Sequence, residues 1–418
     1  MPAQHQDLAG QLLEALQPAR WPVPPDELPA GTAVVGGAVR DALLGRLAPQ
    51  PDLDLVVNSD AVALARSLAQ RHGGSVVVLD AERSIARLVL RGWTLDLARR
   101  MGAWPEDDLL RRDFSANAIA LELAGASGAP RLLDPAGGLD DLALGSLRAL
   151  AERNLLEDPL RLLRGVRLAA ELGFRIEPTT WEWIRRHHRR LGEVAAERVL
   201  AELERLAAAP AGGAGLADVL EAHLLAAWQG ERGPLLAEAH VLPLRTLRCL
   251  HPAAAAQRGL SNTETAMALP LARLAVLLDP ATLRALKASR RLQQQSGRLR
   301  QWWLRLEPAG NPEVLPEAQR LQLQRELEEV LPALALLAAP GWAPQALARW
   351  RDPHDPLFHP RPPLDGAVLQ RKLDLAPSRQ LGELLAHLCQ ERAFGRLPRD
   401  PQGDDPQTLT AARAWLTR

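Results

Sequence analysis

Two aspartates one residue apart, Asp52 and Asp54, stand in the apolar stretch PDLDLVV. Successive side chains of a β-strand alternate between the faces of the sheet, so the two carboxylates share one face while Leu53 and Leu55 share the other. Carboxylates this close repel one another unless a partner cancels their charge. Mg²⁺ does so, because it binds oxygen ligands, often one or two carboxylates together with substrate phosphates. For an isolated pair, the alternative is a solvated edge strand.

A glycine pair, Gly36 and Gly37, with Arg40 behind it forms a second candidate site in VVGGAVRD. The pattern predicts a strand, a tight turn and the start of a helix. Glycine lets the backbone approach a ligand closely, and the first N–H groups of a helix bind anions. Ordinary turns also contain glycine pairs. It is the combination with Asp52 and Asp54 that favours a phosphate-binding turn followed by a metal site.

Further charged residues interrupt apolar stretches downstream. Asp96, in WTLDLARR, is either a third carboxylate beside the first two or a surface residue of another strand, and spacing alone does not decide between them. Arg111, Arg112 and Asp113 precede the apolar part of RRDFSANAIAL. Taken alone, this segment fits a charged helix start.

A row of charged residues follows in EDPLRLLRGVR. Pro159 suits the first position of a helix and Asp158 its cap. Asp158, Arg161, Arg164 and Arg167 recur every three residues, which predicts a slanting row along one side of a helix. Asp158 and Arg161 combine an acceptor with a donor fork, a pair that can read the edge of a base bearing an exocyclic amino group, such as cytosine or adenine. The alternative is an exposed helix with a salt bridge.

The elements that must position these residues form a small mixed α/β region. Hydrophobic alternation and turn signals predict helices at 5–17 and 61–73 and strands at 32–37, 53–57, 75–80, 85–90 and 94–98. From about residue 157 onward the pattern is almost wholly helical. Within it, PAGGAG at 210–215 is typical of a linker, and the proline-rich DPHDPLFHPRPPLDG predicts a break before a last helical region.

Length and composition narrow the class of protein. A chain of 418 residues suggests about two to four domains. The 50 basic and 50 acidic residues cancel, and all but Lys287 and Lys372 of the basic ones are arginines, which we attribute to genomic base composition. Cys249 and Cys389 are far apart and lack metal-ligand spacing. With no membrane-length apolar run and no signal-peptide pattern, we expect a cytoplasmic protein that does not enter a membrane.

In combination, the motifs resemble the class II tRNA nucleotidyltransferases, which build the 3′ CCA end of tRNA without a nucleic-acid template. Bacterial poly(A) polymerases share the same head. The motifs, in the family's order, are GGAVRD (36–41), DLD (52–54), RRDFSANA (111–118), DPAGGLDDL (134–142), EDPLRLLRGVR (157–167) and ERVLAEL (197–203). The likeness covers residues 30–205, and the C-terminal half matches weakly through PLDGAVLQRKL and LGELLAHL.

This resemblance implies an α+β fold in which a small mixed α/β nucleotidyltransferase head precedes an all-helical neck, body and tail. The implied divisions are a catalytic head at 1–145, a neck for base recognition at 146–210, a body at 211–350 and a tRNA-binding tail at 351–418.

The resemblance also implies roles for single residues. Asp52 and Asp54 would hold catalytic Mg²⁺ ions, with Asp96 as an additional candidate. The implied nucleotide-binding residues are Gly36, Gly37, Arg40, Arg112, Asp158, Arg161, Arg164 and Arg167. CTP and ATP would be the substrates, tRNA the partner and pyrophosphate the leaving group. One metal would activate the tRNA 3′-hydroxyl and the other would stabilise the leaving group.

One departure from the family keeps alternatives open. Only LARRMGAWPEDDLL joins the strand of Asp96 to the RRD motif, where family members have a longer flexible segment. A short segment is similar to enzymes that add only CC, which need a separate A-adding enzyme to finish. A poly(A) polymerase with the same head, or a catalytically inactive RNA-binding relative, are the other readings. The nucleotides added to tRNA separate all of these.

Overall fold

The computed structural model describes residues 2–123, 128–229, 236–307, 310–398 and 405–417. The chain forms two compact units, Met1–Glu193 and Val194–Arg418. The first contains a mixed sheet with helices, and in the described part of the second the regular elements are all helices. This confirms the predicted α+β class, with a mixed α/β head followed by helices.

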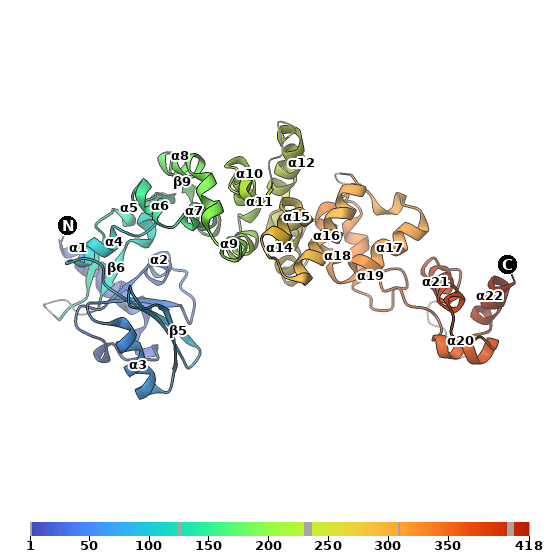
Figure 1. Cartoon of the computed structure of the whole chain (residues 1–418), viewed down its shortest axis with the longest axis horizontal. Helices are drawn as coiled ribbons and strands as arrows, with labels where there is room; N and C mark the ends of the chain where they lie inside the picture. The colour runs from blue at the N-terminus through green and yellow to red at the C-terminus, as the bar shows by residue number, and fades with distance from the viewer. Residues whose placement is uncertain (1, 124–127, 230–235, 308–309, 399–404, 418) are drawn as a thin grey trace. The chain divides into compact units, whose positions relative to one another are not determined.

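The first unit follows the predicted order of strands and helices (Figure 1). Its strands are β1 (Ala33–Val35), β2 (Leu53–Val57), β3 (Ser75–Asp80), β4 (Ile85–Leu90), β5 (Trp93–Arg99), β6 (Ala120–Glu122), β7 (Arg131–Leu133), β8 (Ser146–Leu147) and β9 (Arg175–Ile176). Its helices are α1 (Pro2–Leu16), α2 (Gly37–Leu43), α3 (Ala61–His72), α4 (Pro105–Leu109), α5 (Gly138–Leu144), α6 (Glu152–Glu157), α7 (Leu160–Leu172) and α8 (Pro178–Arg186).

Seven strands form one sheet in the order β3-β4-β5-β2-β1-β6-β7. Only β2 and β5 run parallel, and the other neighbours are antiparallel. Helix α3 packs against β3, β4 and β5. The residues buried there, Leu88, Leu95 and Leu97, alternate with Arg87 and Asp96 on the opposite face. The alternation predicted for β2 is confirmed as well, because Leu53 and Leu55 are fully buried and Asp54 between them is not.

The face that carries Asp54 is covered over only part of its width. Around β1 and β6, Val35, Val56 and Ala120 pack with Leu109 of α4 and Ala118 into an apolar cluster. Toward β4 and β3, the same face presents Arg87 and the exposed Val77 and Leu79. β2 therefore lies where a buried face becomes an open one, and this position sets the environment of its carboxylate.

Two local features differ from the sequence-based expectation. A second, two-stranded sheet joins β8 and β9, although only helices were expected beyond residue 157. Helix α7 begins at Leu160 with Pro159 as its N-cap, one residue later than predicted. Asp158 lies outside the helix, between α6 and α7, and its Oδ1 accepts a hydrogen bond from the Leu160 N–H at 3.2 Å. Asp158 thus still contacts the first turn, but from the preceding bend.

The second unit is helical throughout its described residues (Figure 1). Its helices are α9 (Ala196–Ala208), α10 (Gly212–Glu221), α11 (Ala226–Gln229), α12 (Leu236–Cys249), α13 (Pro252–Gln257), α14 (Asn262–Leu277), α15 (Pro280–Ala285), α16 (Arg290–Arg305), α17 (Glu317–Leu327), α18 (Leu331–Leu337), α19 (Ala343–Trp350), α20 (Gly366–Leu373), α21 (Arg379–Ala393) and α22 (Pro406–Leu416). The proline-rich break is confirmed between α19 and α20.

The linker predicted at 210–215 is wrong. From Gly212 onward these residues form the first turn of α10. A Cβ on Gly212 would lie 2.2 Å from the Leu206 carbonyl oxygen, and one on Gly213 would lie 2.3 Å from that of Leu247. The glycines are therefore required by close backbone packing rather than by chain flexibility.

The boundary between the compact units divides the neck that was predicted at 146–210, so the four-part division of the chain stays a prediction. A search of the described residues finds no helix with the length and apolar character needed to span a membrane.

Candidate active site

Three carboxylates gather on the partly open face of the sheet. The parallel register of β2 and β5 sets Asp54 directly beside Asp96. Asp52 immediately precedes β2 and is exposed, whereas Asp54 is half-buried. All three are close enough for the charges of Asp96 and Asp52 to act on Asp54. The third carboxylate that the sequence left open is therefore a neighbour of the first two.

The Asp54 carboxyl has a raised pKa. Burial is the main cause, Arg112 opposes it, and the charges of Asp96 and Asp52 add to it. A carboxylate destabilised in this way gains from a nearby cation. Among the described residues no ready-made cluster of three or more metal-ligating side chains is present. The hard oxygen donors of Asp52 and Asp54 nevertheless fit a divalent cation that also takes ligands from a substrate.

Arg87 of β4 is a residue that the sequence analysis missed. Its Nε and Nη2 donate to the two carboxylate oxygens of Asp96, at 2.7 and 2.8 Å. Asp96 thus already has a cationic partner, which distinguishes it from Asp52 and Asp54. The signal was available in the sequence, because the short turn at Arg91 and Gly92 fixes the hairpin register that pairs Arg87 with Asp96.

The glycine turn packs directly on the sheet face that carries Asp54. Gly36 has a φ of +72°, and a Cβ there would lie 2.9 Å from Asp54 Oδ2 and 3.5 Å from Arg112 Nη1. Both conformation and space therefore require glycine at this position. Gly37 begins the seven-residue α2, and the atom nearest to a Cβ there would be Arg40 Nη2, at an ordinary 3.6 Å. The structure thus gives a specific reason for the first glycine and none for the second.

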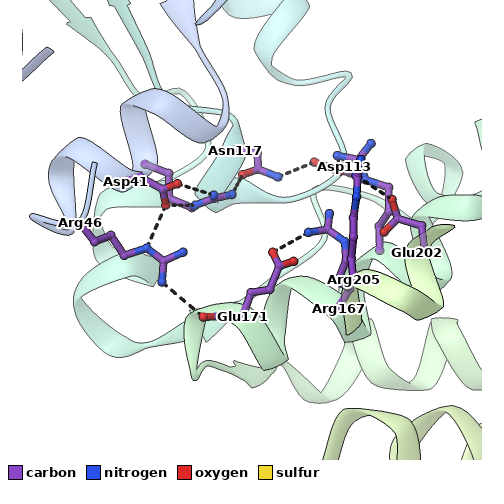
Figure 2. A network of polar contacts seen from close by, with 10 residues as sticks. Asp41, Arg46, Asp113, Asn117, Arg167, Glu171, Glu202 and Arg205 are labelled. Carbon is purple, nitrogen blue, oxygen red and sulfur yellow. Dashed lines mark hydrogen bonds and ion pairs between the residues drawn. The ribbon is translucent and has the colours of Figure 1, made fainter. Parts of the chain in front are cut away.

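Arg40 is buried and engaged by protein groups. It donates to both carboxylate oxygens of Asp41, at 3.0 and 3.1 Å, and its Nη1 donates to Asn117 Oδ1 at 2.6 Å. Asn117 in turn donates to Asp113 Oδ1 at 3.1 Å, and Asp113 pairs with Arg164 of α7 at 3.0 Å. Figure 2 shows Asn117 between α2 and Asp113 in this chain of contacts. The phosphate contact expected of Arg40 stays a prediction.

Asp113 holds this network together. Burial of its carboxyl would raise the pKa, but Arg164, the hydrogen bond from Asn117 and Arg161 together hold the pKa below its ordinary value. Asp113 is therefore a charged anchor between the RRD segment and α7.

The interpretation of residues 111–113 as a helix start is wrong, since α4 ends at Leu109 and the segment is a turn.

Two arginines whose charges act on Asp54 each have an unpaired donor. Within the described residues, Nε of Arg112 and Nε of Arg164 are buried and have no hydrogen-bond partner. Arg112 pairs through Nη2 with Asp108 at 3.3 Å, and its charge also acts on Asp54. Unpaired donors on partly buried cations suit an anion with several oxygens, such as a phosphate group.

The predicted row on α7 divides between several partners. Arg161 Nη1 donates to the carbonyl oxygens of Asn154 and Arg111, at 2.6 and 3.3 Å. Arg167 is buried and pairs with Glu171 of its own helix at 2.5 Å, as Figure 2 shows. Arg161 and Arg164 thus contact the RRD turn, whereas the part of Asp158 in the same site stays a prediction. For Arg167 the contacts do not show a share in the same site, and its role stays a prediction.

Comparison with known proteins agrees with this architecture. The family described as "Poly A polymerase head domain" matches residues 32–148, and the one described as "Probable RNA and SrmB-binding site of polymerase A" matches residues 173–231. A CCA-adding enzyme of Bacillus stearothermophilus, solved in complex with CTP, has the same fold. Its TM-score is 0.67 at 22% identity, over 100% of this chain and 99% of that one. The likeness to this enzyme shows that the two chains share a fold.

Sequence relatives give the family. A CC-adding tRNA nucleotidyltransferase of Synechocystis is 34% identical over 398 residues, which cover 90% of this chain and 92% of the relative. An A-adding tRNA nucleotidyltransferase of Deinococcus radiodurans is 40% identical over 196 residues, 46% of this chain and 43% of the relative. The chain belongs to the family of tRNA nucleotidyltransferases and bacterial poly(A) polymerases, and it is an enzyme of the tRNA nucleotidyltransferase type.

Proposed function

We propose that this enzyme adds cytidine nucleotides to the 3′ end of tRNA, with CTP as donor and pyrophosphate as leaving group. The observation that carries the proposal is the contact of the Gly36 turn with Asp54, beside Asp96 and the arginines Arg112 and Arg164. A triphosphate bound at this turn would place its reactive end at the carboxylates. Two Mg²⁺ ions held by Asp52 and Asp54 would activate the tRNA 3′-hydroxyl and stabilise the leaving group.

The protein's own residues would orient the donor. Arg112 and Arg164, whose Nε donors have no partner in the described structure, would bind phosphate oxygens. Asp158 and Arg161 would select the base, the carboxylate accepting from the exocyclic amino group and the guanidinium donating to the ring. Arg161 would exchange its contacts to the Asn154 and Arg111 carbonyls for the base. The network through Asp113 would hold α7 close enough to the bound nucleotide for Asp158 and Arg161 to reach its base.

Whether the enzyme stops at CC is decided, in this proposal, by the segment that joins β5 to the RRD turn. Asp108 Oδ1 accepts from the Met101 N–H at 3.1 Å, and Asp107 Oδ2 accepts from the Trp104 N–H at 2.9 Å. Gly102 has a φ of +99°, and a Cβ there would lie 2.5 Å from Asp107 Cβ, so the segment leaves no room for a side chain at this position. A short segment braced in this way favours addition of CC alone, with a separate A-adding enzyme to complete the end. Addition of the full CCA from CTP and ATP is the second candidate.

The experiment is a primer-extension assay on a tRNA transcript that ends at the discriminator base. Purified enzyme and Mg²⁺ receive CTP alone, ATP alone or both, and product length is read at single-nucleotide resolution. Growth by two nucleotides under both CTP conditions supports the CC proposal, and growth by three with both substrates supports CCA addition. A long ladder with ATP alone would replace both with poly(A) synthesis. Loss of all extension in a chelator, with recovery on addition of Mg²⁺, tests the metal.

A further inference from the structure

A hollow in the second unit plays no part in the proposed reaction. It has a volume of about 480 Å³, part of it open to solvent, and lies between α17, α19 and the turn that follows α19. Its apolar walls come from Leu323, Trp342, Ala346, Leu357 and Phe358.

One residue that lines the hollow carries a buried polar atom without a hydrogen-bond partner among the described residues. Gln324 of α17 lines it and is only 3% exposed. Within the described part of the chain, its Oε1 has no hydrogen-bond partner. An unpaired buried acceptor is costly, and buried amide oxygens in folded proteins almost always accept a hydrogen bond. The geometry therefore calls for a ligand that brings an N–H or O–H donor to this atom.

The wall opposite is built from the proline-rich segment for which the function gave no role. Asp355 Oδ1 accepts from the backbone N–H groups of Leu357 and Phe358, at 3.0 Å each. Arg349 binds both oxygens of Asp355, at 2.8 and 3.1 Å, and its guanidinium lies 4.9 Å from the centroid of the Phe358 ring. An aromatic ring and a stacked cation are thus held in fixed positions at the pocket.

We propose that this pocket binds a nucleobase that carries an exocyclic amino group. The apolar and aromatic walls, with Trp342 and Phe358, suit a flat heterocycle. Gln324 Oε1 would accept from the amino group, and Arg349, with Arg320 also lining the hollow, would favour the attached phosphate. A base of tRNA and a free nucleotide share this chemistry. The site lies in the second unit and is separate from the carboxylates of the first.

The test is photolabelling of the full-length enzyme with 8-azidoadenosine monophosphate, followed by peptide mapping by mass spectrometry. Label on peptides within 312–358 is expected in the unaltered enzyme. In Gln324→Leu it should fall about tenfold, as for a lost hydrogen bond to a buried acceptor. Gln322→Leu is the matched control, because Gln322 lies on the same helix but is exposed, and its label should not change. The inosine analogue, which lacks the amino group, should label the pocket as weakly as Gln324→Leu.

Three further measurements make the result interpretable. Labelled peptides from 36–167 report the proposed catalytic site, so failure there and failure in 312–358 are seen separately. The thermal midpoint of Gln324→Leu should equal or exceed that of the unaltered enzyme, because an unpaired acceptor is removed. Displacement of the 312–358 label by excess tRNA would assign the pocket to a tRNA base, and persistence would assign it to a free nucleotide. No label in 312–358, or label that Gln324→Leu does not reduce, would overturn the proposal and leave a water-filled hollow.

Discussion

Arginine is used differently in the two compact units. In the first, the arginines around Asp54 face carboxylates, as Arg87 faces Asp96 and Arg164 faces Asp113. In the second, several arginines donate to backbone carbonyls where helices end. Arg258 binds the carbonyls of residues 335 and 338 at the end of α18, and Arg300 binds those of residues 275 and 276 at the end of α14.

Arg273 is the extreme case in the second unit. It is fully buried and donates to the carbonyl oxygens of Leu250, Ala207 and Ala209, at 3.0, 2.6 and 2.8 Å. Burial lowers its pKa to about 10, so the guanidinium remains charged at neutral pH. Carbonyls at helix ends carry partial negative charge, and a cation there is stabilised without a carboxylate.

The contrast shows that the partner of an arginine, rather than its number or burial, indicates its use. In the proposed function, the arginines that face carboxylates beside the Gly36 turn bind the substrate. In the second unit, Arg258, Arg273 and Arg300 face carbonyls at helix ends, and we expect them to serve the fold. The predictions below test each side of this contrast.

The largest effect is expected at the carboxylates. Asp54→Ala should reduce nucleotide incorporation on the order of a thousandfold or more, because a metal contribution of several kcal/mol is lost. Binding of tRNA, measured by filter retention, should stay within a small factor of the unaltered enzyme. Retained turnover in this variant would remove Asp54 from the metal site.

On the other side of the contrast, Arg273→Met should lower the free energy of unfolding of the second unit by about 3 kcal/mol, since buried carbonyls lose their donor. Thermal unfolding followed by circular dichroism measures the change. Arg291→Met is the matched control, because the Arg291 side chain is 81% exposed and should change little. Equal stability of the two variants would show that Arg273 is not a structural cap.

The glycine turn tests whether the catalytic face depends on close packing. Gly36→Ala places a Cβ 2.9 Å from Asp54 Oδ2 and should lower kcat by about a hundredfold through displacement of the carboxylate. Gly45→Ala has a similar φ of +66° but no atom within 4 Å of its Cβ, so it measures backbone strain alone. Similar kcat losses in both would trace the effect to strain instead of to Asp54.

The ion pair between Glu264 and Arg351 in the second unit is expected to stabilise the fold in a way that depends on pH. The hydrogen bond from Arg351 lowers the pKa of Glu264 to about 2, from an ordinary 4.5. Because the folded-state pKa is depressed, this stabilisation is present above pH 4.5 and is lost as the pH falls toward 2. Glu264→Gln should therefore cost about 2 kcal/mol of stability at pH 7 and little at pH 2. Urea unfolding at the two pH values measures both, and a pH-independent difference would contradict the assignment.

The smallest effect is expected in base selection. Arg161→Ala should reduce discrimination between CTP and UTP by about tenfold, the loss of one polar contact, and should weaken tRNA affinity less. The ratio of kcat/KM for the two nucleotides reports it. Unchanged selectivity would leave Arg161 with only the structural contacts to Asn154 and Arg111.

Local patterns in the sequence were sufficient to predict most of the head. The strands from β2 to β5 were found because branched and apolar residues alternate or cluster between turn signals, and the placement of Asp54 opposite Leu53 and Leu55 follows from that period. The proximity of Asp96 could not be predicted, because it depends on the register of a parallel pair whose strands are far apart in sequence. The same holds for Arg40, whose partner Asn117 lies 77 residues away.

Other errors arose where one local signal has two physical causes. Glycines at 212 and 213 signalled a flexible linker, but they permit helix α10 to approach the carbonyls of residues 206 and 247. Likewise, the three-residue spacing on α7 indicated one row, yet Arg164 faces Asp113 and Arg167 faces Glu171. The spacing of residues predicts on which side of a helix their side chains lie. The partners of those side chains depend on the elements that pack against the helix.

The carbonyls bound by Arg273 lie 23 to 66 residues away from it along the chain. Its guanidinium can leave water only after the ends of α9 and α12 have docked on α14. Until then the charged guanidinium remains hydrated, so it does not stabilise partly docked forms of this region. We therefore expect α9, α12 and α14 to dock in a single cooperative step, in which their amides become protected from hydrogen exchange together.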